Sequence, residues 1–546
     1  MRSLVLRRSF TSVVPPVAPP AAAAAAAAPP AKSKKELPLT ALTAVTSVDG
    51  RYGKKTRPLR FYCSEFALIR KRIEVEVKWV QLLCSGEQFP WQSDETKAAL
   101  SKEFGLVSGF PKLSREANLE LEAIYQNFSL QDAETVKEIE KTTNHDVKAV
   151  EYFLRERVEA SDKLKPISEL IHICCTSEDI NNTAYSLMFR DARDKVLLPN
   201  MDEIIVKLAE MSIEFANQPM LSRTHGQPAT PSTLGKELAN YSFRLAHQRQ
   251  QVASCQVAGK FNGAVGNYAA HMVAMPEVNW PRACETFVTR DLQLSWNPYT
   301  TQIEPHDALA ELFHGLIRFN NVLLDLNRDM WQYCSSGLVK QKTVATEVGS
   351  STMPHKVNPI DFENSEGNIG IANAMYSHFA SKLQVSRLQR DLSDSTVLRQ
   401  VGAAFAHSLI SFESSVKGLR KLSVNEQKLQ QELNDHWEVL AEPIQTVMRR
   451  YHVANAYELL KEATKGKAFS PEDYKNFVKS LQLPEGSAEA KQRLVDLTPA
   501  TYVGLSQHLA ETLVDGHMPS ASYPEAETTP LLNVTPKQPE VEQKKE

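Results

Sequence analysis

A long helical periodicity constrains the fold of this chain more than any other feature of its sequence. Along residues 305–333 apolar side chains recur at spacings of three and four, which marks one face of a single long helix. Similar patterns cover 232–258, 362–385 and 396–421, whereas alternating strand-like patterns are scarce. Helices of this length need long partners to bury their apolar faces, so the sequence predicts an all-α fold built on a bundle of long helices.

The composition is that of a soluble globular protein. The chain has 546 residues, 42% of them hydrophobic and 23% charged, which is enough for two or three structural regions. The 62 Lys and Arg residues nearly balance the 65 Asp and Glu residues, so the formal net charge of −3 gives no reason to expect nucleic acid as a partner. No run of 18 apolar residues is present, and we therefore expect no membrane span.

The first 37 residues differ in composition from the rest of the chain. Residues 1–35 contain six Lys or Arg residues and no Asp or Glu, and they include the alanine run 21–28. An acid-free start with Arg and Ser is typical of organelle transit peptides, so we expect import into a mitochondrion or plastid. The alternative is a low-complexity extension without a targeting signal, on a protein of the cytoplasm.

Composition and periodicity together divide the chain into five parts. The last residues are rich in proline and charge and poor in large apolar side chains, so we expect them to be disordered. The predicted parts are a leader (1–37), an N-terminal helical domain (38–150), a central long-helix domain (151–420), a C-terminal helical domain (421–517) and a tail (518–546).

The segment 349–359 is the most distinctive motif. It reads Gly-Ser-Ser-Thr-Met-Pro-His-Lys-Val-Asn-Pro, a loop of small hydroxyl residues and backbone donors that also carries a cation, Lys356, and an amide, Asn358. Such a loop is suited to binding a carboxylate. The seven cysteines of the chain include no Cys-x-x-Cys pair, so we expect neither a structural disulfide nor a zinc site.

This loop resembles the signature loop of the fumarase/aspartase superfamily, whose members release fumarate from succinyl-bearing substrates. Further segments are similar to the bacterial type of one family within it, the adenylosuccinate lyases, and the resemblance spans nearly all of 38–515. These segments are 47–53, 142–151, 175–182, 222–230, 297–307 and 387–399.

The resemblance implies a fold, an activity and an assembly. The implied fold is the family's three-region helical fold, in a homotetramer whose long helices form a central bundle and whose sites each borrow segments from three subunits. The implied reaction is β-elimination of fumarate from adenylosuccinate to give AMP, and from a succinylaminoimidazole carboxamide ribotide in purine nucleotide synthesis. The implied ligand is a small nucleotide, with no metal and no cofactor.

The elimination requires one base and one acid. A weakly acidic proton beside a carboxylate is removed while the departing nitrogen is protonated. The resemblance assigns the base to Ser350, the first serine of the signature loop, and the acid to His225 of the Thr-His-Gly-Gln-Pro motif. A serine is a poor base unless a cation stabilises its ionised form, and Lys356 is our candidate for that task and for holding the aci-carboxylate that follows proton loss.

The resemblance also implies substrate contacts. Arginines are suited to the nucleotide phosphate because the guanidinium fork matches phosphate oxygens, whereas Thr and Ser hydroxyls with Lys and Asn are suited to the succinyl carboxylates. We assign His145 a supporting role in binding or proton handling. The implied contacts are Arg51, Tyr52, Asn144, His145, Asp146, Thr176, Ser177, Gln302, Lys356, Asn358, Asn364, Arg390, Ser395, Thr396, Val397, Leu398 and Arg399.

Two alternatives remain at this point. Another fumarate-releasing lyase, such as argininosuccinate lyase or fumarase, would share the loop but would not need the phosphate-type residues Arg51, Tyr52 and Arg399. A non-catalytic protein on the same fold would be recognised by loss of Ser350, His225 or Lys356, and the sequence retains all three.

Overall fold

The structure is a computed structural model that describes residues 37–85, 93–95, 98, 110–342, 352–353, 356–464 and 469–513. The predicted leader, apart from residue 37, and the predicted tail lie outside the described residues. The five-part division of the chain therefore remains a prediction.

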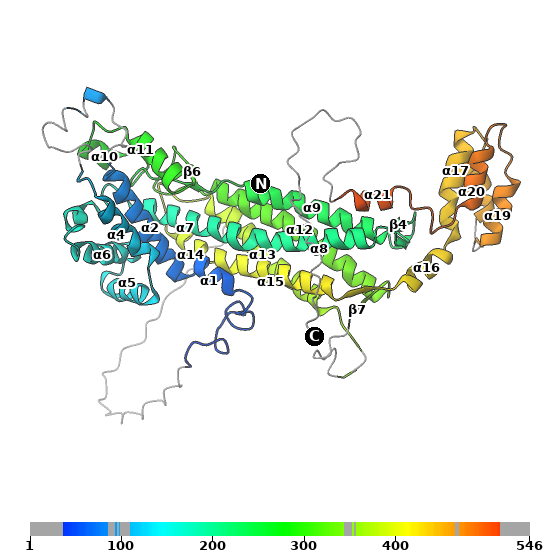
Figure 1. Cartoon of the computed structure of the whole chain (residues 1–546), viewed down its shortest axis with the longest axis horizontal. Helices are drawn as coiled ribbons and strands as arrows, with labels where there is room; N and C mark the ends of the chain where they lie inside the picture. Colours follow the sequence, from blue (N-terminus) through cyan, green and yellow to red (C-terminus); the bar gives the residue numbers. More distant parts are fainter. Residues whose placement is uncertain are drawn as a thin grey trace, which may run out of the picture.

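Five long helices run side by side through the middle of the molecule (Figure 1). They are α8 (Leu198–Glu214), α9 (Leu234–Ser254), α12 (Asp307–Ser335), α13 (Ile360–Leu383) and α15 (Val401–Arg420). The apolar face expected along 305–333 is buried in α12, and α12 packs against α9 and α13 while α13 packs against α15. The predicted all-α fold on a long-helix bundle is thus confirmed.

One predicted helix is divided in two. The pattern over 396–421 predicted a single helix, but the structure places a short helix, α14 (Ser393–Leu398), before α15 begins at Val401. Gln400 is the residue that precedes α15, and neither Gly nor Pro marks the break. The prediction of one continuous helix is wrong here because hydrophobic periodicity runs across the break and carries no signal of it.

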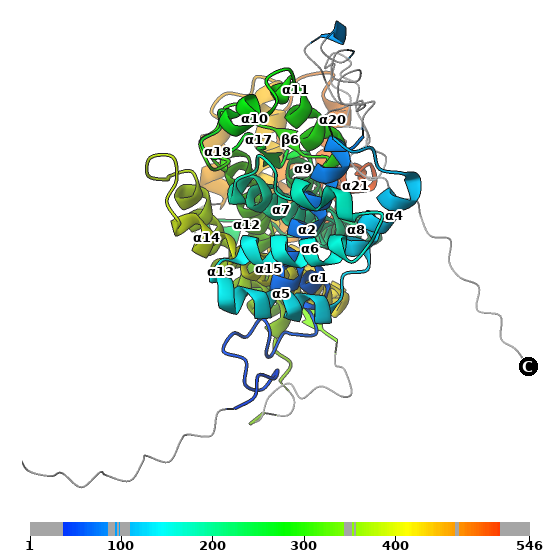
Figure 2. The ribbon, with the colours of Figure 1, turned by 90° about the vertical axis from the view of Figure 1, so that its left-hand side faces the viewer.

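Further helices gather at the two ends of the bundle. The end-on view looks onto α4, α5 and α6, with the C-terminal helices behind the bundle (Figure 2). The helices of the first end are η1 (Arg57–Leu59), α1 (Arg60–Cys63), α2 (Glu65–Leu83), α4 (Arg115–Gln126), α5 (Leu130–Thr143), α6 (Asp146–Glu159), η2 (Lys165–Leu170), α7 (Ser177–Ala192), η3 (Arg193–Leu197), α10 (Ala269–Ala274), α11 (Trp280–Thr286) and η4 (Phe287–Asp291).

The C-terminal helices have a hydrophobic core of their own. It contains Trp437, Ile444, Tyr474 and Leu494, separate from the core of the bundle. The helices that contribute to this core are η5 (Trp437–Leu440), α17 (Ala441–Arg450), α18 (Ala456–Thr464), α19 (Pro471–Ser480) and α20 (Ala488–Asp496). Before them α16 (Glu426–Asn434) places Leu429 in the core of the bundle, and after them α21 (Ser506–Glu511) returns to pack on α9 and α8.

Strands form only four short pairs within the described residues. Three pairs are antiparallel: β1 (Pro219–Met220) with β4 (Ser232–Thr233), β2 (Arg223–Thr224) with β3 (Gln227–Pro228), and β7 (Val339–Gln341) with β8 (Leu422–Val424). The fourth, β5 (Ala258–Gly259) with β6 (Ser295–Trp296), is parallel.

A buried polar triad fixes the register of three bundle helices. The Asn327 amide of α12 donates to Ser365 Oγ of α13 at 2.9 Å and accepts from Ser415 Oγ of α15 at 2.9 Å, and the two serine oxygens are 2.8 Å apart. All three side chains are buried, so a shift of one helix would leave polar groups without partners. Close approach of α13 and α15 also requires Gly418, since a Cβ there would lie 2.8 Å from the Phe362 ring.

No helix among the described segments combines the length and the apolar character needed to cross a bilayer.

Candidate active site

His225 lies at the tip of a hairpin. The antiparallel strands β2 and β3 pair Thr224 with Gln227, so His225 and Gly226 form the two-residue turn between them. Both turn residues have left-handed backbone angles, φ 54° for His225 and φ 76° for Gly226, as a tight hairpin turn requires. The turn therefore presents the His225 side chain to solvent at the outer end of the hairpin, where it is exposed.

The C-terminal helices hold the base of this hairpin. Arg223 donates to Glu432 of α16 at 3.1 Å, and Thr230 donates a hydrogen bond to Glu442 of α17. On the other side Ser506 of α21 lies 3.4 Å from Ser232 of β4, oxygen to oxygen. The position of the exposed tip is thus set by three helices that follow it in sequence by about 200 residues or more.

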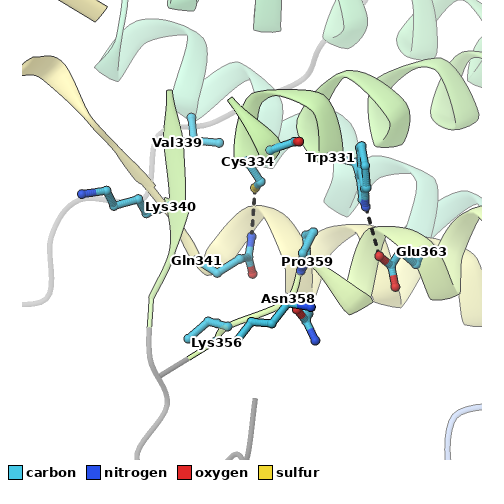
Figure 3. Close-up of a pocket in the computed structure, with 11 residues that line it drawn as sticks. Trp331, Cys334, Val339, Lys340, Gln341, Lys356, Asn358, Pro359 and Glu363 are labelled. Carbon is cyan, nitrogen blue, oxygen red and sulfur yellow. Dashed lines mark hydrogen bonds between the residues drawn. The ribbon is translucent and has the colours of Figure 1, made fainter. Parts of the chain in front are cut away.

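The signature loop is described only in part. Ser350 lies outside the described residues, as do the rest of 343–351 and residues 354–355. Lys356 and Asn358 are described, and both line a cavity of about 500 Å³ between the loop, α12, β7 and the first turn of α13 (Figure 3). Trp331 of α12 donates to Glu363 of α13 across one side of this cavity at 3.0 Å.

Glu363 is a cavity residue that the sequence reasoning did not assign. The sequence offers one sign of this position, since Glu363 stands directly before Asn364 and four residues after the end of the signature loop. The first turn of α13 brings Glu363 back toward that loop.

Tyr52 and Asn364 are brought together from distant parts of the sequence. The Asn364 amide donates to Tyr52 Oη at 2.8 Å and accepts from Ser414 Oγ at 2.9 Å, and Lys55 in turn donates to Ser414 at 3.1 Å. The Arg51 guanidinium lies 5.9 Å from the centre of the Tyr52 ring, a cation–π contact. The first predicted phosphate contacts therefore lie beside the start of α13.

Asn144, His145 and Asp146 join helices α5 and α6. Asn144 ends α5 with a left-handed φ of 49°, and His145 Nδ1 accepts from the Lys148 backbone N–H at 3.1 Å and so caps α6. Asp146 Oδ2 accepts from Arg399 at 3.1 Å. Partial burial raises the pKa of the Asp146 carboxyl, but nearby arginines outweigh this and hold the pKa below its ordinary value, so the carboxylate is ionised.

Thr176 and Gln302 meet at the start of α7. Gln302 Nε2 lies 3.5 Å from Thr176 Oγ1, and the Gln302 backbone N–H donates to the Gln389 carbonyl at 3.3 Å. Ser177 is the first residue of α7, so its backbone N–H is among those that an α-helix leaves unpaired at its start. This arrangement of hydroxyls, an amide and a helix start can bind a carboxylate.

The segment 390–399 adds two arginines around α14. Arg390 forms an ion pair of 2.8 Å with Glu178, and Arg399 donates to the Ser395 hydroxyl. Thr396 is exposed on α14, whereas Leu398 is buried in the main core and Val397 packs against it. The side chains of Val397 and Leu398 are therefore engaged in packing.

One chain does not gather all of these residues. The Thr176, Arg390 and Arg399 groups lie around α7 and α14 in one half of the molecule, whereas the His225 hairpin lies beside β4 in the other half (Figure 1). Asp146, Arg390, Arg399 and their partners form one cluster, Tyr52 and Asn364 a second, Lys356 and Asn358 line the cavity, and His225 stands apart. Among the described residues, no group of three or more His, Cys, Asp and Glu side chains is placed to hold a metal ion.

Comparison with known proteins covers most of the chain. Residues 50–373 match the family model described as "Lyase", and residues 386–503 match the model described as "Adenylosuccinate lyase C-terminal". The chain is 51% identical to the adenylosuccinate lyase of Vibrio cholerae over 477 residues, which are 87% of this chain and 100% of that protein. It is 51% identical to the Escherichia coli adenylosuccinate lyase over 479 residues, 88% of this chain and 99% of that protein.

A solved structure shares the fold. The crystal structure of 3-carboxy-cis,cis-muconate lactonizing enzyme from Pseudomonas putida matches with a TM-score of 0.60 over 84% of this chain and 96% of that chain. The two sequences are 20% identical, so this likeness concerns the fold alone.

The comparisons overturn the expected organellar location. The relatives at about half identity are enzymes of bacteria, which have neither mitochondria nor plastids, and the Vibrio cholerae protein is matched over its whole length. The prediction of organellar import is wrong because an Arg-, Ala- and Pro-rich start is equally typical of a low-complexity extension without a targeting signal. The cytoplasm, the alternative given by the sequence, agrees better with these relatives.

Proposed function

The chain belongs to the adenylosuccinate lyase family of the fumarase/aspartase superfamily, and from this premise we propose which of its residues bind the substrate and move the protons. Its activity is that of a carbon–nitrogen lyase that cleaves adenylosuccinate into fumarate and AMP. The observation that carries this conclusion is the 51% identity that extends over the whole length of a curated family member.

A direct assay tests the activity. The purified full-length chain is expected to form AMP and fumarate in equal amounts from adenylosuccinate, with no added metal or cofactor. The succinylaminoimidazole carboxamide ribotide is a second substrate in our proposal, since its succinyl–amine bond is of the same kind. Turnover of argininosuccinate or malate without formation of AMP would contradict the assignment.

In the proposed reaction two side chains move protons. Ser350 removes the proton from the carbon beside the succinyl carboxylate, and His225 protonates the departing nitrogen of the purine. Lys356 stabilises the ionised serine and the aci-carboxylate that forms when the proton leaves. The support for Lys356 and Asn358 is that both line one cavity with room for the succinyl group.

The remaining predicted residues bind the two ends of the substrate. Thr176 and Ser177, at the start of α7, receive a succinyl carboxylate together with Gln302, which lies at hydrogen-bonding distance from Thr176. The phosphate is bound by two arginine groups, Arg51 with Tyr52 and Arg390 with Arg399, aided by Ser395. The further members of the proposed site are Asn144, His145, Asp146, Asn364, Thr396, Val397 and Leu398.

We propose that the active form is a homotetramer in which each site combines segments of different subunits. Support comes from the distance between the His225 hairpin and α14 in Figure 1, which leaves a single chain without a complete site. The exposed apolar residues Ile360 and Ile371 on α13, 54% and 49% exposed, are also in keeping with a bundle helix that packs against another copy.

Subunit mixing tests the shared site. His225→Asn and Arg399→Met damage opposite halves of the chain, so each pure variant should have little activity at low substrate concentration. After the two are unfolded together and refolded, roughly a quarter of the sites should receive an intact His225 and an intact Arg399 from different subunits, since assembly is random. We therefore expect activity to return to roughly a quarter of that of the wild type.

The control is a mixture of His225→Asn with itself, refolded in the same way. If labelled subunits exchange and yet the mixture stays inactive, the two residues act in the same subunit and the proposal of shared sites is wrong.

A further inference from the structure

Arg72 is a buried arginine that the proposed reaction does not use. It lies in the middle of α2 and is only 2% exposed, in a stretch where the charged residues Lys71, Glu74 and Glu76 are also buried. Burying a guanidinium away from water is costly unless partners satisfy it. Its partners therefore indicate why the position holds a charge.

The guanidinium of Arg72 spans two other helices. Its Nε donates to Asn181 Oδ1 of α7 at 2.9 Å, and its NH2 group donates to Asp146 Oδ2 of α6 at 2.7 Å. Its NH1 group is buried and has no hydrogen-bond partner within the ranges that the structure describes. Because the planar fork fixes the angle between its donors, the side chain sets α6 and α7 at one relative position.

One branch of contacts leads from Arg72 to Arg399. Asp146 Oδ2 accepts from Arg72 and from Arg399, at 2.7 Å and 3.1 Å, so one carboxylate oxygen lies between two guanidinium groups. Arg399 is 39% exposed and also donates to Ser395, and its direction is therefore set by Asp146 on one side and by α14 on the other.

The second branch leads to Arg390. Asn181, whose oxygen accepts from Arg72, donates through Nδ2 to Glu178 Oε1 at 2.8 Å. The same oxygen of Glu178 lies 2.8 Å from NH2 of Arg390, and Asp394 lies at a longer distance of 3.8 Å from Arg390 Nε. Both carboxylates are buried, with 3% exposure each, so they hold Arg390 from the protein side and leave its outer side for a ligand.

We propose that Arg72 is a positioning residue that sets Arg390 and Arg399 to receive the phosphate group of the nucleotide. The two branches meet at Arg72, so this buried side chain joins the two arginines through direct hydrogen bonds and ion pairs. A shorter route along α14, through Asp394 and Ser395, also connects them. The inference rests on the proposed function, since it is the phosphate end of that substrate that the two arginines would bind.

Two substitutions at position 72 test the inference. Arg72→Gln removes the charge, and Arg72→Lys keeps the charge but loses the fork, so neither should preserve both branches. In each variant we expect the KM for adenylosuccinate and the Kd for AMP, measured by calorimetry, to rise at least tenfold. We expect kcat to fall less than threefold, because the reacting end of the substrate is bound by other segments.

Lys71→Gln is the matched control. Lys71 is the next residue of α2 and is also buried in ion pairs, at 2.9 Å from Glu74 and 2.8 Å from Asp191, but none of these residues belongs to the two branches. This variant should lower the melting temperature and leave KM and the Kd for AMP within twofold of the wild type. Asn181→Leu, which cuts only the branch to Glu178, is the second test if the variants at position 72 do not fold.

The outcomes distinguish a failure of the proposed function from a failure of the proposed role of Arg72. If the wild type does not convert adenylosuccinate, the proposed function fails. If the wild type is active and the folded variants at positions 72 and 181 bind AMP as the wild type does, the function stands and the role of Arg72 is wrong. An equal rise of KM in Lys71→Gln would also overturn it, because a general loss of stability would then explain the effect.

Discussion

Replacement of His225 by asparagine is expected to lower kcat by roughly 10³-fold, the middle of the range for loss of a general acid. The leaving nitrogen of the purine must gain a proton as the bond to the succinyl carbon breaks, and an amide cannot supply one near neutral pH. The exposed position of His225 at the hairpin tip means that little packing is lost. We therefore expect the melting temperature and the oligomeric state to remain those of the wild type.

Asparagine is the replacement of choice because of the backbone at this position. His225 has a φ of 54°, in the left-handed region, which asparagine tolerates better than alanine or a branched residue. His508→Ala, at an exposed histidine of α21, is the control for loss of an imidazole elsewhere on the surface. A kcat for His225→Asn within tenfold of the wild type would remove His225 from the role of acid.

Replacement of Asp179 by alanine is expected to cost about 3–5 kcal/mol of the free energy of unfolding, the usual penalty for breaking a buried ion pair from one side. Asp179 and Lys260 are both 0% exposed and lie 2.8 Å apart. The Asp179 carboxylate also accepts from the backbone N–H groups of Thr176, Asn262 and Gly263, at 2.9 Å, 3.1 Å and 3.1 Å. The alanine variant would leave a buried ammonium and three backbone donors, two of them buried, without these partners.

Asp202→Ala is the matched control for this substitution. Asp202 forms a two-point pair with Arg249, at 2.7 Å and 2.8 Å, but its side chain is 46% exposed, so its loss should cost about 1 kcal/mol or less. Denaturant unfolding of both variants measures the difference. A cost below 1 kcal/mol for Asp179→Ala would show that water or a rearranged side chain satisfies Lys260.

The long bundle helices could be predicted from the sequence because their spacing is a local property. A pattern along 305–333 predicted the helix that the structure places at Asp307–Ser335, with two residues of difference at each end. The break between α14 and α15 could not be predicted, since no glycine or proline marks it and the apolar spacing continues on both sides.

The hydrogen-bond partners of the site residues could not be predicted from the sequence. Tyr52 and Asn364 form a hydrogen bond across 312 positions, and Arg72 reaches Asp146 across 74. Spacing along the chain carries no signal for such contacts, which depend on how separate helices pack. Arg72 stands among several charged residues of α2, so the sequence does not indicate which of them has buried partners on other helices.

The triad of Asn327, Ser365 and Ser415 has a consequence for how distant sites in an assembly can communicate. A slide of α13 along its neighbours by one helical turn, about 5.4 Å, would break both hydrogen bonds of Ser365, to Asn327 and to Ser415, and separate Asn364 from Tyr52. Sliding of the long helices past one another by one turn is therefore not available as a mechanism of allosteric coupling. In the proposed tetramer, cooperativity between sites would then travel as rotation of whole subunits, with each bundle moving as one rigid body.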